Sequence, residues 1–141
     1  MIAGLSHVSI AVPKLEAAIE MLGRNYGLVA GEIRTNRGQG VRLVCFDLGN
    51  AKLELIEPTN PESPIAKFLE RNPRGGIHHF SLAAENFDAA IENLTAKGVS
   101  LLGTKGQQNV DGDPIAFIHP RDFLGSLVEL EGHWTSKTRK V

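Results

Sequence analysis

An internal repeat is the feature that most constrains the fold of this chain. The segment SHVSIAV, at Ser6–Val12, aligns with HHFSLAA, at His78–Ala84, and each combines a histidine with an alternating apolar run. Such alternation predicts a β-strand, and the recurrence indicates two copies of one structural unit. After each strand, apolar residues recur at helical spacing, which predicts helices within residues 13–28 and 85–99.

Short strands follow each predicted helix, separated by Gly, Asn, Asp and Pro turns. We expect them at residues 41–49 and 51–58 in the first half, and at residues 99–103, 114–120 and 126–132 in the second. The predicted fold is α+β, with two βαβββ modules whose sheets curve into a half-open β cup. Within a single domain of residues 1–141 we expect a first module at 1–58, a linker with one short helix at 59–75, a second module at 76–134 and a basic tail at 135–141.

The charge balance excludes several classes of partner. Fifteen Lys and Arg stand against sixteen Asp and Glu, so a net charge of -1 gives no global field that would attract nucleic acid or an anionic membrane. An anionic ligand must therefore be held by local groups. Cys45 is the only cysteine, which rules out an intramolecular disulfide and favours a reducing compartment. The first residues show neither a signal-peptide pattern nor a transmembrane stretch, and we expect a cytoplasmic protein.

Four polar residues occupy equivalent positions in the two copies. Strand alternation places His7 on the face opposite Val8, and it places Glu54 and Glu129 opposite the apolar residues that flank them. His7 and Glu54 in the first copy match His79 and Glu129 in the second. In a cup formed by the two copies, these side chains would converge as two imidazole and two carboxylate ligands. Such a set suits one divalent ion, namely Co, Mn, Ni, Zn or Fe, and leaves two positions for water or a bidentate substrate.

Each of these residues also has a simpler interpretation. A single His or Glu in a strand is more often solvated or hydrogen bonded than a metal ligand, and it is the recurrence that favours the metal site. His78 competes with His79, but only His79 aligns with the first-copy histidine. His119 is expected either to line the binding pocket or to make a structural hydrogen bond at a turn. Glu131 shares the face of Glu129 but lies closer to the polar tail, and we expect it to be exposed to solvent.

Segments along nearly the whole chain carry a resemblance to a known family. They are LSHVSIAVPKLEAAI, QGVRLVCFDLGNAKLELIEP, SPIAKFLERNPRGGIHHFSL and IAFIHPRDFLGSLVELEG. With its paired modules, the chain resembles the vicinal oxygen chelate (glyoxalase/bleomycin resistance/dioxygenase) superfamily. Within that superfamily, SPIAKFLE followed by GGIHH, and later FIHP with VELE, are most similar to the methylmalonyl-CoA epimerase family.

The resemblance implies a metal-dependent epimerase or isomerase of methylmalonyl-CoA or a related acyl-CoA, acting through a metal-stabilised enolate. It also implies a homodimer and favours cobalt as the ion. The implied metal ligands are His7, Glu54, His79 and Glu129, and the implied catalytic residues are Glu129 and Glu54. The implied substrate-binding residues are Gln39, Ser63, Lys67, His119 and Arg121, and the cations that would meet the CoA phosphates are Lys67, Arg71, Arg74, Lys105 and Arg121.

One departure from the family pattern bears on the reaction. Epimerases of this family tend to carry an acid near the QGV segment, whereas this chain has no Asp or Glu between Glu32 and Asp47. Arg34, Arg37 and Arg42 fill the region instead, which would suit an anionic ligand. Three explanations stay open: a metal-ligand carboxylate doubles as the base, an acid from elsewhere replaces it, or the protein acts on another substrate. The candidate acids are Glu54, Glu129, Asp111 and Asp113.

Two other functions fit the same scaffold. A glyoxalase I-like lactoylglutathione lyase would use the same metal, with Glu54 or Glu129 as the base. Lyases of this kind often build the site across a dimer, whereas both ligand pairs here lie in one chain. A binding protein would hold an acyl-CoA or another anion without turnover, and the missing acid favours it. An extradiol dioxygenase is less favoured, because a fourth protein ligand would take a position that substrate or oxygen needs.

Overall fold

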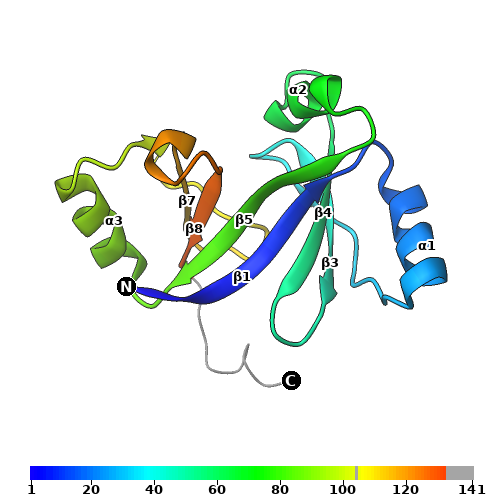
Figure 1. Ribbon diagram of the computed structural model, residues 1–141, viewed down its shortest axis with the longest axis horizontal. Coiled ribbons are helices and arrows are strands. Elements are labelled where there is room, and N and C mark those ends of the chain that lie inside the picture. The colour runs from blue at the N-terminus through cyan, green and yellow to red at the C-terminus, as the bar shows by residue number, and fades with distance from the viewer. Residues whose placement is uncertain (104, 133–141) are drawn as a thin grey trace. The chain divides into compact units, whose positions relative to one another are not determined.

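A computed structural model of the chain describes residues 1–103 and 105–132. These residues form both helices and strands, so the chain is α+β, as the sequence predicts (Figure 1). The elements, in chain order, are β1 (Ile2–Ala11), α1 (Leu15–Tyr26), β2 (Arg34–Asn36), β3 (Val41–Asp47), β4 (Lys52–Pro58), α2 (Pro64–Arg71), β5 (Gly76–Ala84), α3 (Phe87–Ala96), β6 (Leu101–Leu102), β7 (Ile115–Ile118), the 3-10 turn η1 (Pro120–Asp122) and β8 (Val128–Glu131).

The chain divides into two compact units. Among the described residues, the first unit contains Met1–His7 and those between positions 79 and 132, and the second contains Val8–His78. The first unit has the strand order β5-β8-β7-β6, in which β5 and β8 are parallel and the other pairs are antiparallel. The second unit has the order β2-β3-β4-β1. Both β1 and β5 are divided between the units, so the units do not coincide with the two copies of the repeat.

Helix α1 covers one face of the sheet in the second unit (Figure 1). Its apolar side packs with β3 and β4 in a core cluster formed by Val12, Leu15, Val44, Phe46 and Leu55. Gly27 ends the helix in the left-handed conformation, with φ of 68°, which glycine adopts without the steric cost of a Cβ. The amphipathic pattern read from the sequence therefore corresponds to a real helix–sheet interface.

The first turn of α1 is held by an ion-pair network. The Glu57 carboxylate accepts a hydrogen bond from the Leu15 amide at 2.7 Å and another from Arg42 Nη1 at 3.0 Å. Arg42 also pairs with Glu16, and this guanidinium lowers the pKa of the Glu16 carboxyl. Arg42 thus binds carboxylates of its own chain, whereas the sequence suggested that it suits an external anion.

Helix α3 packs on the sheet of the first unit as α1 packs on the sheet of the second. The Asn86 side chain caps it by accepting a hydrogen bond from the Ala89 amide at 3.0 Å. Its apolar side packs on β5 and β8 around Ala84, Ala90 and Leu130. This helix matches the one predicted within residues 85–99.

The observed elements differ from the expected ones most clearly in the first copy. Strand β1 begins at Ile2 rather than at Ser6, and β2, at Arg34–Asn36, was not singled out by the hydrophobic pattern. With β2 included, the first copy reads β1-α1-β2-β3-β4, which is the expected βαβββ order. None of the helices in the described part of the chain is long and apolar enough to span a membrane.

Candidate metal centre

Strands β1, β5 and β8 place the predicted second-copy ligands and His7 within the first unit. Burial alternates along β5, where His79 and Ser81 are buried and their neighbours are less so. Ser81 lies directly opposite Glu129 in the β5–β8 register. The period of the strand and the pairing of two strands therefore bring a histidine, a serine and a glutamate to one face.

Four side chains of the first unit form a compact group, which we call the histidine–glutamate cluster: His7, His79, Glu129 and Glu131. All four are buried, with 4% to 9% of each residue exposed. His7 Nε2 lies 3.7 Å from Glu129 Oε1, and His79 Nε2 lies 3.7 Å from Glu129 Oε2. The two imidazole rings meet edge to face, with centroids 5.8 Å apart. The structure thus brings together three of the four predicted ligands, His7, His79 and Glu129.

Glu131 contradicts the expectation of solvent exposure, because only 9% of the residue is exposed. Its Oε1 accepts a hydrogen bond from Ser6 Oγ at 2.8 Å, and its Oε2 lies 3.6 Å from His7 Nδ1. A buried carboxylate needs such partners to compensate for lost hydration. The sequence reasoning placed the end of the buried face one alternation too early.

The chemistry of the cluster fits a divalent ion. His7, Glu129 and Glu131 each offer a ligand atom, and these atoms all lie within 4.8 Å of one another. Nitrogen and oxygen atoms bound to one ion at usual metal–ligand distances lie about 3.0–3.4 Å apart. The 3.7 Å separations from Glu129 to His7 and His79 need only a few tenths of an ångström of adjustment. Imidazole and carboxylate donors without thiolate suit Co, Mn, Ni, Zn or Fe.

A serine–glutamate pair recurs in the two copies. Ser81 Oγ donates to Glu129 Oε1 at 3.0 Å in the first unit, and Ser9 Oγ donates to Glu54 Oε1 at 2.5 Å in the second. Burial raises the pKa of the Glu54 carboxyl. Sequence reasoning missed these serines as partners of the glutamates, although their position two residues after each aligned histidine is a signal of the repeat. The approach of Glu54 to the histidine–glutamate cluster stays a prediction, because Glu54 belongs to the second unit.

His78 points to a different environment from that of His79. Its ring packs edge to face on Phe68, with centroids 5.2 Å apart, and burial lowers its pKa. The His79 ring instead meets Phe117 at 5.4 Å. The alignment with the first copy therefore selected the histidine that lies beside Glu129.

The residues predicted to bind substrate lie in both units, and two of them cap short helices. Ser63 Oγ accepts a hydrogen bond from the Ile65 amide at the start of α2, and His119 Nδ1 accepts one from the Arg121 amide at η1. The structural hydrogen bond considered for His119 is thus present. Arg121 is exposed and donates to Ser100 Oγ. Lys67 is exposed on α2.

Gln39 lies in the turn between β2 and β3. Its backbone N–H donates a hydrogen bond to Asn36 Oδ1 at 3.2 Å, and its side-chain oxygen accepts one from Asn36 Nδ2 at 3.4 Å. The side chain is thus engaged in shaping its own turn. Contact of Gln39 with a substrate stays a prediction.

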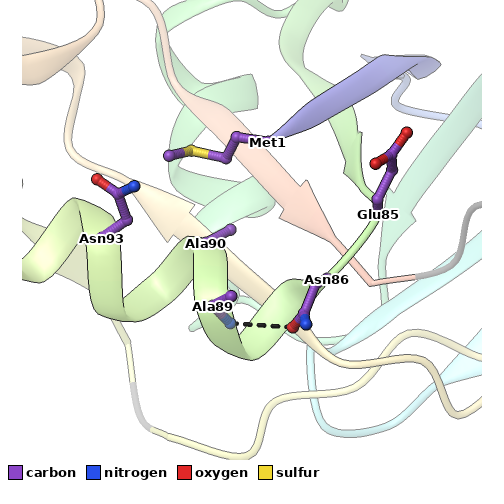
Figure 2. Close-up of a pocket in the computed structure, with 6 residues that line it drawn as sticks. All are labelled: Met1, Glu85, Asn86, Ala89, Ala90 and Asn93. Carbon is purple, nitrogen blue, oxygen red and sulfur yellow. Dashed lines mark hydrogen bonds between the residues drawn. The ribbon is translucent and has the colours of Figure 1, made fainter.

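A surface pocket of about 220 Å³ lies at the start of α3 (Figure 2). Its lining consists of Met1, Glu85, Asn86, Ala89, Ala90 and Asn93. None of these residues belongs to the histidine–glutamate cluster, and Asn86 is already used as the cap of α3. The pocket therefore offers no set of converging catalytic groups.

Comparisons with known proteins agree on one family. The family model described as Glyoxalase/Bleomycin resistance protein/Dioxygenase superfamily matches residues 6–117. The chain is 44% identical over 133 residues to the ethylmalonyl-CoA/methylmalonyl-CoA epimerase of Cereibacter sphaeroides, which covers 93% of this chain and 98% of that protein.

Solved structures show the same likeness. A methylmalonyl-CoA epimerase from Mycobacterium tuberculosis has a TM-score of 0.87 at 31% identity, covering 96% of this chain and 91% of that one. A Streptomyces coelicolor methylmalonyl-CoA epimerase variant, in complex with 2-nitronate-propionyl-CoA, has a TM-score of 0.88 at 29% identity, covering 96% and 100%. The expected glyoxalase-like fold class is confirmed.

Proposed function

Because this chain belongs to the Glyoxalase/Bleomycin resistance protein/Dioxygenase superfamily and, within it, to the methylmalonyl-CoA epimerase family, we propose that it epimerises methylmalonyl-CoA or a closely related acyl-CoA. The reaction inverts the carbon that lies between the thioester and the carboxylate. The observation that carries the proposal is the buried histidine–glutamate cluster, in a chain that aligns with epimerases along nearly its whole length.

His7, His79 and Glu129 are the residues that would hold a divalent ion, with Glu54 as the proposed fourth ligand and cobalt as the proposed ion. The ion would supply positive charge to the thioester and carboxylate oxygens, on which negative charge develops when the α-proton leaves. Ser81 orients the site by donating to Glu129 Oε1, which leaves Oε2 facing His79. The donor set and its burial support this assignment.

Proton transfer needs a carboxylate that removes the α-proton and an acid that returns a proton to the opposite face. We assign these roles to Glu129 and Glu54, because the sequence has no acid from residue 33 to residue 46. Each of the two carboxylates accepts a hydrogen bond from a serine on the first strand of its copy. By contrast, the amides of Asp111 and Asp113 both donate to Asn109 Oδ1, which ties these acids to the turn of their own loop.

The acyl-CoA would be held by local groups. Lys67, Arg71, Arg74, Lys105 and Arg121 are the proposed partners of the CoA phosphates, and Gln39, Ser63 and His119 are proposed to contact the substrate. The net charge of -1 requires that such attraction be local. We further propose a homodimer, as the family resemblance implies, and a cytoplasmic location, which suits a chain whose only cysteine is Cys45.

Solvent deuterium exchange tests the proposed reaction directly. Metal-loaded protein is incubated with methylmalonyl-CoA in D₂O, and the α-hydrogen is followed by NMR or mass spectrometry. We expect deuterium at the α-carbon with metal-loaded protein and far slower exchange after chelation. Absence of exchange by protein with a verified metal content would overturn the proposal, and consumption of the glutathione hemithioacetal of methylglyoxal would then indicate a lyase.

A further inference from the structure

The Ser6 hydroxyl lies between His7 and Glu131 in the first unit. Ser6 Oγ donates to Glu131 Oε1 at 2.8 Å and lies 3.1 Å from His7 Nδ1. A hydroxyl has a single proton to donate, and here that proton is used on Glu131. Towards His7, Ser6 Oγ is therefore an acceptor, which requires that the proton of the neutral imidazole be on Nδ1.

The position of this proton determines which nitrogen of His7 can bind a metal. A neutral imidazole with its proton on Nδ1 has its lone pair on Nε2. Nε2 is the nitrogen that lies 3.7 Å from Glu129 Oε1, and Glu129 in turn lies 3.7 Å from His79 Nε2. The lone pair of His7 is thus directed to the side of the cluster where the other predicted ligands are.

Glu131 adds charge to this arrangement. Its Oε2 lies 3.6 Å from His7 Nδ1, so the carboxylate attracts the positive end of the Nδ1–H bond. The aligned position in the first copy is Ile56, which has no carboxylate. Glu131 is therefore not part of the repeated ligand pattern, and its burial calls for a separate role.

We propose that Ser6 and Glu131 are positioning residues that hold His7 in the Nδ1–H tautomer and present its Nε2 to the metal. This inference deepens the proposed function and rests on its metal site. Carboxylates that orient a ligating imidazole through its other nitrogen typically change metal affinity by about 10–100-fold when they are lost. Ser6 would transmit the same restraint, because it is the hydroxyl that links Glu131 to the ring.

NMR of metal-free protein tests the tautomer without any metal or substrate. Long-range ¹H–¹⁵N correlations of ¹⁵N-histidine-labelled protein, at a pH where the imidazole is neutral, identify the protonated nitrogen of His7. We expect Nδ1–H in the wild type, a mixture of tautomers in Ser6→Ala and Glu131→Ala, and Nδ1–H again in Glu131→Gln, whose amide oxygen can still accept from Ser6. A wild-type His7 protonated on Nε2 would overturn the proposal.

Cobalt affinity, measured by calorimetry, tests the consequence for the metal site. We expect the dissociation constant to rise about tenfold or more in Ser6→Ala and Glu131→Ala, with a smaller rise in Glu131→Gln. Glu85→Gln, an exposed carboxylate of the same unit, is the matched control and should keep the wild-type affinity. If Ser6→Ala binds cobalt like the wild type while Glu131→Ala binds it weakly, Glu131 is a direct ligand and the proposed role is wrong.

The two proposals can fail separately. A chain that shows the Nδ1–H tautomer and loses cobalt affinity in Ser6→Ala, yet exchanges no deuterium into methylmalonyl-CoA, supports the role of Ser6 and Glu131 and contradicts the epimerase function. If the wild type exchanges deuterium but its His7 carries the proton on Nε2, the epimerase function is supported and the role of Ser6 and Glu131 is contradicted. Because Ser6→Ala removes only one oxygen atom, circular dichroism of that variant suffices to verify its fold.

Discussion

Gly75, which immediately precedes β5, provides a quantitative test of how the chain enters the strand that carries His79. Gly75 has φ of +94°, and a Cβ added there would lie 2.4 Å from the backbone oxygen of Ala11. A non-glycine residue in the left-handed region costs about 1–2 kcal/mol. Relieving the contact with Ala11 requires the backbone to move, and overpacking of this kind costs about 1–3 kcal/mol. Gly75→Ala should therefore lower the free energy of unfolding by about 2–5 kcal/mol, a large part of the total for a typical domain.

A second glycine separates the two contributions. Gly98 also has a positive φ, +79°, but an added Cβ there meets no atom within 4 Å. Gly98→Ala should cost only the backbone part, about 1–2 kcal/mol. Urea unfolding of metal-free protein, with the slopes compared to verify that the unfolding transition is the same, measures both variants. If Gly75→Ala is no less stable than Gly98→Ala, the close approach to Ala11 adds nothing to the cost of the substitution.

Three further predictions concern the site and its surroundings. His79→Ala should abolish tight cobalt binding, whereas the neighbouring His78→Ala should retain it, as titration calorimetry can determine; equal losses would contradict the register of β5. Ser81→Ala should destabilise metal-free protein by about 1.5–3 kcal/mol in urea unfolding, because it removes a hydrogen bond to the buried Glu129 carboxylate; an unchanged midpoint would show that the bond contributes nothing. Glu57→Ala should lower the melting temperature, because it removes the hydrogen bond to the first turn of α1, while cobalt affinity stays at the wild-type value. A weaker cobalt affinity would show that the ion-pair network at α1 influences the metal site.

The sequence predicted those parts of the site that recur in both copies. Strand periodicity determines which face a residue occupies, and the alignment of the two copies determines the register, so the proximity of His7, His79 and Glu129 could be predicted without coordinates. Glu131 was missed because the aligned position is Ile56, so no recurrence marked it. In the folded unit its carboxylate accepts a hydrogen bond from Ser6, which is distant in sequence.

Other features were missed because their signals are short. Strand β2 has only three residues, and its polar sequence RTN shows no apolar alternation; it is a strand because it pairs with β3. The cap formed by Ser63 does have a local signal, since a serine before a proline is typical of a helix start. This local pattern indicates the cap that the structure contains, and the contact of Ser63 with a substrate stays a prediction.

The most direct test of the central claim, that His7, His79 and Glu129 form a metal centre, is anomalous diffraction from crystals of the cobalt-loaded protein. We expect one anomalous peak per chain, at a coordination distance of about 2.0–2.2 Å from the imidazole nitrogens of His7 and His79 and from a carboxylate oxygen of Glu129. A peak bound only by exposed carboxylates, or no peak at the histidine–glutamate cluster in protein shown to contain cobalt, would contradict it.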